Sequence, residues 1–223
     1  VFLTISDEGY SRSWTYFAGL KKLNEDVHFV KLSPLHLIRD FLSLRKKYSR
    51  DCIFIIMSPS HYLTFFTRVF LGKRIILDAG WSLSEAALIS RRNFGLFGLN
   101  AIKLYLIDFI SCHIAKRIIL ESEHQRKFYS RIFFISEEKT ICIYTGLDET
   151  QYFLDKKSPL PPDYFNNSRI VLFRGKYSRE AGLEVLAEAT LLLRNEPITF
   201  WIFCPGIKNN LQFSSNCFIS TEY

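Results

Sequence analysis

Short apolar runs alternate with amphipathic stretches through the first two thirds of the chain. Runs such as IFII and RIIL are continuously apolar, which is typical of strands covered on both faces of a parallel sheet. The pattern predicts strands at 1–6, 27–32, 52–57, 74–78, 117–120 and 140–144, and helices at 13–23, 35–48, 62–71, 83–89, 99–115 and 123–133. Strands that alternate with helices predict a doubly wound, Rossmann-like α/β domain with a mostly parallel sheet.

The segment 154–168, LDKKSPLPPDYFNNS, interrupts this pattern. Its three prolines indicate a linker between a first domain at 1–153 and the start of a second at 169–223. Beyond it we expect strands at 169–173, 198–204 and 216–220 and a helix at 180–194. Three short parallel strands leave open edges and an uncovered face, so we expect this second domain to be incomplete, or completed by a partner.

Composition narrows the class of protein. Apolar residues make up 48% of the 223 positions, with 21 Phe and 11 Tyr, which excludes disorder as the main state. The longest apolar stretch, 96–110, is interrupted by Asn100, Lys103 and Asp108, so it is not expected to span a membrane.

The chain begins without Met or a signal peptide, which suggests a fragment or a processed chain. Five cysteines with no C-x-x-C spacing indicate a cytoplasmic protein and predict neither structural zinc nor a disulfide framework.

Positive charge is concentrated in the first domain. Residues 1–150 hold 21 basic and 15 acidic side chains, against 8 and 7 in residues 151–223. Such a field suits an anionic ligand, an anionic lipid surface or nucleic acid. The basic residues are spread over several elements, so nucleic acid is not the expected partner. Arg91 and Arg92 precede an apolar stretch that is suited either to a membrane interface or to core packing.

Several sequence motifs are missing. The chain has no P-loop, G-x-G-x-x-G, H-E-x-x-H, G-x-S-x-G or D-x-D. No metal site or cofactor is therefore expected. His61 and His113 are expected at a helix surface or half-buried, rather than as ligands.

The ends of the expected strands are where ligands bind in open α/β sheets. After the first strand, Gly9 and Arg12 suit either an anion or a plain polar turn. After the fourth, Asp78, Gly80 and Trp81 suit a hydroxylated substrate, although Asp78 suits a helix cap as well.

Ser122 follows the fifth strand and is ambiguous in the same way. It is either a site residue or the N-cap of the helix at 123–133. Gln125 stands three residues further on, which is the spacing of a capping box and favours the cap.

The strongest local signal is FRGKYSREAG at 173–182. The expected strand leads through Arg174 to Gly175. Lys176 and Arg179 come next, and a helix is expected from about Glu180. Cations, backbone amides and a helix dipole at one point suit a diphosphate. The alternative is a basic loop with solvated side chains.

Three segments in order resemble GT-B glycosyltransferases of the family 4 type. CHIAKRIILES resembles A-D-x-V-x-x-x-S, ICIYTGLDETQYF resembles V-I-P-N-G-V-D-x-x-x-F, and IVLFRGKYSREAGLEVLAEA resembles G-R-L-x-x-E-K-G-x-x-x-L-x-E-A. The matching positions are Ala115, Ser122, Gly146, Asp148, Gly175, Glu180, Gly182, Leu186, Glu188 and Ala189, with Tyr152 in the place of the Phe.

The chain also departs from that pattern. Lys176 stands where the family has the diphosphate Arg, and Ala181 where it has a Lys. Thr145 replaces an Asn, and Gly80 with Trp81 stand where many members have a His. The E-x7-E helix of the family would fall after Tyr223.

The resemblance implies two Rossmann-like domains, with the nucleotide sugar on the second and the acceptor on the first. It implies transfer of the sugar to an acceptor hydroxyl with retention and without a metal, the leaving charge being stabilised by cations and a helix dipole. Acceptors in the family include lipid-linked glycans and surface polysaccharides, which fits a protein peripheral on the inner face of a membrane. The alternative is a truncated or degenerate relative that binds sugar nucleotide or a partner without catalysis.

Overall fold

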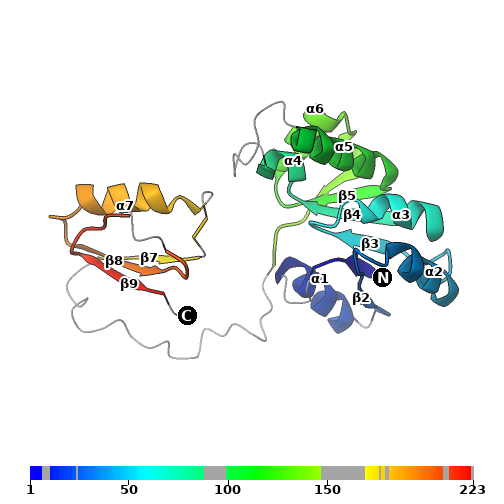
Figure 1. Ribbon diagram of the computed structural model, residues 1–223, viewed down its shortest axis with the longest axis horizontal. Helices are drawn as coiled ribbons and strands as arrows, with labels where there is room; N and C mark the ends of the chain where they lie inside the picture. The colour runs from blue at the N-terminus through cyan, green and yellow to red at the C-terminus, as the bar shows by residue number, and fades with distance from the viewer. Residues whose placement is uncertain are drawn as a thin grey trace. The chain divides into compact units, whose positions relative to one another are not determined.

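The computed structural model describes residues 1–6, 11–23, 25–87, 99–146, 169–175, 177–178, 181–207 and 211–221. By its internal contacts the chain divides into two units, Val1–Phe153 and Leu154–Tyr223. Figure 1 shows the elements of each unit.

The first unit is built on a six-stranded sheet in the order β2-β1-β3-β4-β5-β6, and every pairing in it is parallel. Its strands are β1 (Phe2–Thr4), β2 (Phe29–Lys31), β3 (Phe54–Met57), β4 (Ile75–Gly80), β5 (Arg117–Leu120) and β6 (Thr140–Cys142). Its helices are α1 (Ser11–Lys22), α2 (Leu37–Lys47), α3 (Leu63–Phe70), α4 (Leu83–Glu85), α5 (Leu99–Ile114) and α6 (Glu123–Phe133), with a 3-10 turn, η2 (Glu137–Lys139). The predicted doubly wound α/β domain is confirmed.

Helices cover both faces of this sheet, and the alternation of side chains in β1 shows which helix lies on which face. Phe2 contacts Phe17 of α1, whereas Leu3 points the other way and joins a cluster with Phe41 of α2. The helices α2, α3, α5 and α6 follow one another across that second face (Figure 1). This arrangement is what right-handed crossovers require for this strand order.

The core of the first unit explains why the central strands are continuously apolar. Ile56 of β3, Leu77 of β4 and Ile118 of β5 are fully buried beneath the helices. Burial of an Ile or Leu side chain stabilises the folded state by about 1.5–3 kcal/mol. The strands β3 to β5 therefore form a stable support for the polar residues at their carboxyl ends.

The second unit has a smaller parallel sheet in the order β7-β8-β9. It comprises β7 (Arg169–Arg174), α7 (Leu183–Leu192), β8 (Ile198–Phe203) and β9 (Cys217–Ser220). Its buried cluster consists of Leu183, Phe200, Ile202 and Cys204. The strand β7 lies at an edge of this sheet, and its Leu172 is 61% exposed.

The helix α7 differs from its predicted start, whereas the prediction for α4 agrees with the structure as far as it is described. The helix α7 starts at Leu183 instead of residue 180, because Gly182 has a φ of 68° and interrupts α-helical geometry there. The helix α4 continues as a π-helical turn through residues 86 and 87, and residues 88 and 89, the rest of the predicted helix, lie outside the described part of the chain.

Candidate functional site

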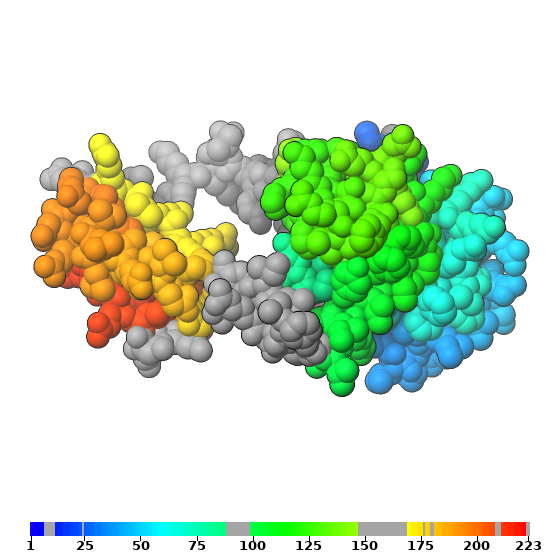
Figure 2. Space-filling model, turned by 90° about the horizontal axis from the view of Figure 1, so that it is seen from above, coloured from blue at the N-terminus to red at the C-terminus, as the bar shows by residue number. Residues whose placement is uncertain are grey.

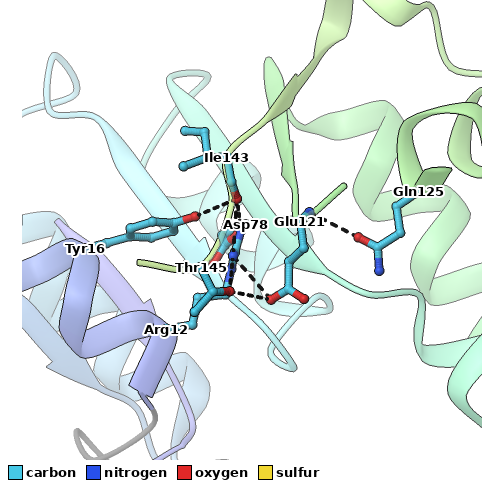
Figure 3. A network of polar contacts seen from close by, with 7 residues as sticks. All are labelled: Arg12, Tyr16, Asp78, Glu121, Gln125, Ile143 and Thr145. Carbon is cyan, nitrogen blue, oxygen red and sulfur yellow. Dashed lines mark hydrogen bonds and ion pairs between the residues drawn. The ribbon is translucent and has the colours of Figure 1, made fainter. Parts of the chain in front are cut away.

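The carboxyl ends of β1, β4, β5 and β6 lie along one edge of the larger sheet, and polar side chains gather there. Arg12 enters from the first turns of α1, Asp78 from β4, Glu121 from the end of β5 and Thr145 from the segment after β6 (Figure 3). Because parallel strands end at the same edge, residues far apart in sequence meet at this point.

Arg12 is the centre of this cluster. Its side chain is only 3% exposed, and its Nε lies 3.0 Å from both carboxylate oxygens of Asp78, with Nη2 2.8 Å from Oδ1. Its Nη1 donates to Thr145 Oγ1 at 2.9 Å and lies 3.2 Å from Glu121 Oε1. All three guanidinium nitrogens therefore have partners inside the protein.

Asp78 and Arg12 each shift the pKa of the other. Burial raises the pKa of the Asp78 carboxyl, and the hydrogen bond and charge of Arg12 act against that shift. Burial acts to lower the pKa of Arg12, but the contacts with Asp78 outweigh it, so that the net shift is upward. Arg12 thus remains a cation that neutralises a carboxylate of its own chain.

Tyr16 completes the cluster on the side of α1. Its ring lies under the Arg12 guanidinium, 4.8 Å from ring centroid to Cζ, and its hydroxyl donates to the Ile143 carbonyl at 3.3 Å. Burial, followed by the charge of Asp78, raises the pKa of Tyr16 to about 12. The phenol is therefore protonated at neutral pH and acts as a hydrogen-bond donor.

Glu121 gives the cluster a second carboxylate, which is partly exposed. One Arg12 cation faces the two carboxylates of Asp78 and Glu121, and the Glu121 side chain is 31% exposed while that of Asp78 is fully buried. Thr145 also donates to Glu121 Oε1, at 3.2 Å. An exposed, partly neutralised carboxylate suits a hydroxyl donor better than an anion.

The end of β4 is shaped by Gly80. Its φ of 60° is left-handed, and a Cβ there would lie 3.4 Å from Ser58 Cβ at the end of β3. The register between β4 and β5 shifts between Asp78 and Gly80. Trp81, which follows, is half-buried, and its predicted stacking against a substrate ring stays a prediction.

The N-cap that the sequence favours at Ser122 is present, and a second serine, Ser82, caps α4. Ser122 Oγ accepts from the Gln125 amide at 3.2 Å at the start of α6, and Gln125 Oε1 accepts in return from the Glu121 amide at 3.1 Å. The cap of α4 is Ser82, whose Oγ accepts from the Glu85 amide at 3.0 Å. The alternative reading of Asp78 as that cap is therefore wrong.

A second polar centre, which the sequence did not predict, lies beside the first. Asp108 of α5 is fully buried, and its Oδ2 accepts from Ser82 Oγ at 2.8 Å, Ser84 N at 2.9 Å and Ser84 Oγ at 3.0 Å. Its Oδ1 lies 3.9 Å from His61 Nε2. The only signal in the sequence was an acidic residue within an apolar helix.

His61 is fully buried before the start of α3, so its expected place at a helix surface or half-buried is wrong. Burial lowers the pKa of His61, and the Asp108 carboxylate acts in the opposite direction. His113, by contrast, is exposed near the end of α5.

The predicted diphosphate loop of the second unit is described in part. Lys176 and Arg179 lie outside the described residues, as does Gly9 of the first unit. Arg174 is exposed at the end of β7, and the Gly175 amide donates to the Phe203 carbonyl at 3.0 Å, which extends the sheet. The amides of Tyr177 and Ala181 also donate to carbonyls of the protein. Any anion held here would use other amides, together with the cations.

The architecture of the chain is that of GT-B-like proteins. The solved structure of Anabaena Alr3699/HepE in complex with UDP-glucose matches 98% of this chain and 67% of its own length, with a TM-score of 0.56 and 14% identity. The structure of TarM matches 84% of this chain with a TM-score of 0.56 and 16% identity, and the chain spans 36% of its length. HepE in complex with UDP and glucose matches 91% of this chain and 60% of its own length, with a TM-score of 0.52 and 14% identity.

These similarities confirm the expected fold, while the family 4 type stays a prediction. No protein-family model matches the sequence. No curated protein matches it either.

Proposed function

We propose that the chain belongs to a glycosyltransferase that uses a nucleoside-diphosphate sugar. The observation that carries this proposal is the likeness of 98% of the chain to HepE, a protein solved with UDP-glucose bound. The ordered resemblance of three sequence blocks to GT-B glycosyltransferases supports it independently.

The donor is proposed to bind on the second unit. Arg174 is the last residue of β7, and Gly175, Lys176 and Arg179 follow it in the sequence. The carboxyl end of a strand is where α/β sheets bind ligands. Cations at this point would neutralise the diphosphate and stabilise the charge of the leaving group.

The acceptor is proposed to bind at the edge of the first unit. Glu121 offers a carboxylate that is partly exposed, and Trp81 and Gly80 lie at the neighbouring strand end. Arg12, Asp78 and Ser122 would hold this edge in place, since their polar groups are engaged within the protein. Acceptors of the proposed class are hydroxyls of surface polysaccharides or lipid-linked glycans.

The proposed reaction needs no cofactor and no metal. The bond between the sugar C1 and the diphosphate oxygen breaks, the diphosphate leaves with the bonding pair, and a new bond joins C1 to the acceptor oxygen. The hydroxyl proton passes to the diphosphate or to water. Retention at C1 is part of the proposal, by analogy with the family 4 resemblance.

The test is a calorimetric screen of nucleoside-diphosphate sugars against the chain, followed by an assay for release of nucleoside diphosphate when acceptors are added. Binding and release are expected for one donor. Binding without release for every acceptor would favour the alternative, a relative that binds sugar nucleotide without catalysis. A screen with no binding would contradict both.

A further inference from the structure

Three neighbouring helices of the first unit are apolar on the side that faces away from the sheet. The exposed apolar residues are Leu35, Ile38 and Leu42 at α2, Phe65 and Val69 on α3, and Leu99, Ile102, Leu106 and Ile110 on α5, each 45–88% exposed. A helix packed on a sheet normally presents polar residues to water. We call this surface the outer helical face.

The apolar residues form stripes rather than scattered points. Within each helix they recur every three or four residues, which places them along one side. The helix α3 contacts both α2 and α5, and the surfaces of the three adjoin in Figure 2. Between α2 and α3 an open groove of about 830 Å³ is lined by Leu35, Ile38, Leu42 and Phe66. The outer helical face therefore presents apolar stripes on three adjoining helices.

Basic residues are interleaved with these stripes. On the three helices they are Arg39, Arg45, Lys46, Lys47, Arg68 and Lys103, all exposed. Arg39 and Lys46 line the groove beside Leu42. The same helices contain two acidic residues, of which Asp108 is fully buried and Asp40 accepts from the Ser33 amide. The outer helical face thus combines apolar and positive groups with almost no exposed negative charge.

This combination suits an anionic lipid surface better than a second copy of the chain. A second copy of the chain would bring the same basic residues against one another in a symmetric contact. The surface of an anionic bilayer accepts apolar side chains at the acyl boundary and cations among its headgroups. Within the described ranges, no helix is long and apolar enough to cross a membrane.

We propose that the outer helical face docks the protein on an anionic lipid surface. The stripes of α2, α3 and α5 enter the headgroup region, and the interleaved Arg and Lys side chains bind lipid phosphates. This inference does not depend on the proposed function.

The test is flotation of the whole chain with vesicles of phosphatidylcholine, with or without phosphatidylglycerol. Binding is expected only with phosphatidylglycerol and is expected to weaken with salt. Each basic residue near such a surface contributes about fivefold in partitioning, so Arg39→Glu with Lys46→Glu should lower binding about 25-fold or more. Ile38→Gln with Leu42→Gln should lower it as well, even at low salt.

The matched control lies on the opposite face of the sheet. Lys21 and Lys22 are exposed at the end of α1, so Lys21→Glu with Lys22→Glu changes the net charge equally and should bind nearly as well as the parent. An equal loss in this control would overturn the proposal, as would no binding by the parent or equal binding to neutral vesicles. A dimer in solution that Ile38→Gln with Leu42→Gln abolishes would assign the face to a second copy instead. Calorimetric titration with nucleotide sugar tests the proposed function separately.

Discussion

Two fully buried carboxylates of the first unit are stabilised in different ways. Asp78 faces the guanidinium of Arg12 in a two-pronged contact at 2.8–3.0 Å. Asp108 instead receives three hydrogen bonds from two serines on one oxygen, and the other oxygen lies 3.9 Å from His61. One centre is a charge pair and the other is a charge held by neutral donors. The comparison shows that a cation at a strand end can serve the fold instead of a ligand.

The charge pair should be the more sensitive of the two centres. Arg12→Met leaves Asp78 buried without its cation, and breaking such a pair costs about 3–5 kcal/mol of the free energy of unfolding. Urea denaturation measures this cost. Addition of Asp78→Asn to the same chain should recover part of it, because the uncompensated charge is removed.

The control for this prediction is Arg39→Met, since the Arg39 side chain is 75% exposed and its pair with Asp40 is long, at 3.5 Å. That variant should change the free energy of unfolding by less than about 0.5 kcal/mol. Similar values for Arg12→Met and Arg39→Met would show that the buried pair does not support the fold.

The Asp108 centre should respond less strongly. Asp108→Asn removes the charge that strengthens three hydrogen bonds, and leaves no unpaired ion behind. We expect a loss of about 2–3 kcal/mol in the same measurement. Asp51→Asn is the matched control, because the Asp51 side chain is 83% exposed. Equal losses in the free energy of unfolding for Asp108→Asn and Asp51→Asn would contradict a stabilising role for the hydrogen bonds to Asp108.

The pH dependence of stability sharpens the same comparison. The pKa of His61 is lowered from 6.5 by burial, so below pH 6.5 the unfolded chain binds a proton that the folded chain refuses. Stability should therefore fall as pH drops from 6.5 toward the folded pKa, by at most about 1.4 kcal/mol per pH unit. His61→Gln should reduce the change of the urea midpoint between pH 7 and pH 5. His113→Gln, at an exposed position, should leave that change as it is in the parent. Equal slopes for the two variants would contradict this.

The smallest expected effect is at the cap of α6. Ser122→Ala removes the hydrogen bond to the Gln125 amide and should cost about 1 kcal/mol. Ser136 precedes η2 without a side-chain cap bond, so Ser136→Ala should be close to neutral. Urea denaturation of both variants separates capping from a general effect of losing a serine hydroxyl.

Much of the fold could be predicted from the pattern of apolar residues. The strands of both units fall within or close to their expected ranges, because runs such as those of β3 and β5 are apolar enough to be buried on both faces. The start of α7 could not be predicted, because the left-handed backbone at Gly182 is not apparent in a helical pattern. The short turn η2 has no periodic signal and was missed.

The candidate site could be predicted only in part. Asp78 and Arg12 were singled out by their places at strand ends, but their pairing spans 66 positions and depends on the order of the strands. His61 was misplaced for a related reason, since its burial comes from packing against α5 rather than from its own neighbours. Local sequence therefore located polar residues at the edge without revealing which of them bind one another.

The proposed donor site is tested most directly by titration of the parent chain, Lys176→Ala and Lys116→Ala with the nucleoside-diphosphate sugars of the screen in a calorimeter. Lys116 is an exposed residue between α5 and β5 and serves as the control. Loss of one charge-assisted contact to a diphosphate, about 1–3 kcal/mol, should weaken binding by roughly 5- to 150-fold in Lys176→Ala alone. Equal affinities of the three chains, or no heat from any of them, would contradict donor binding at the turn after β7.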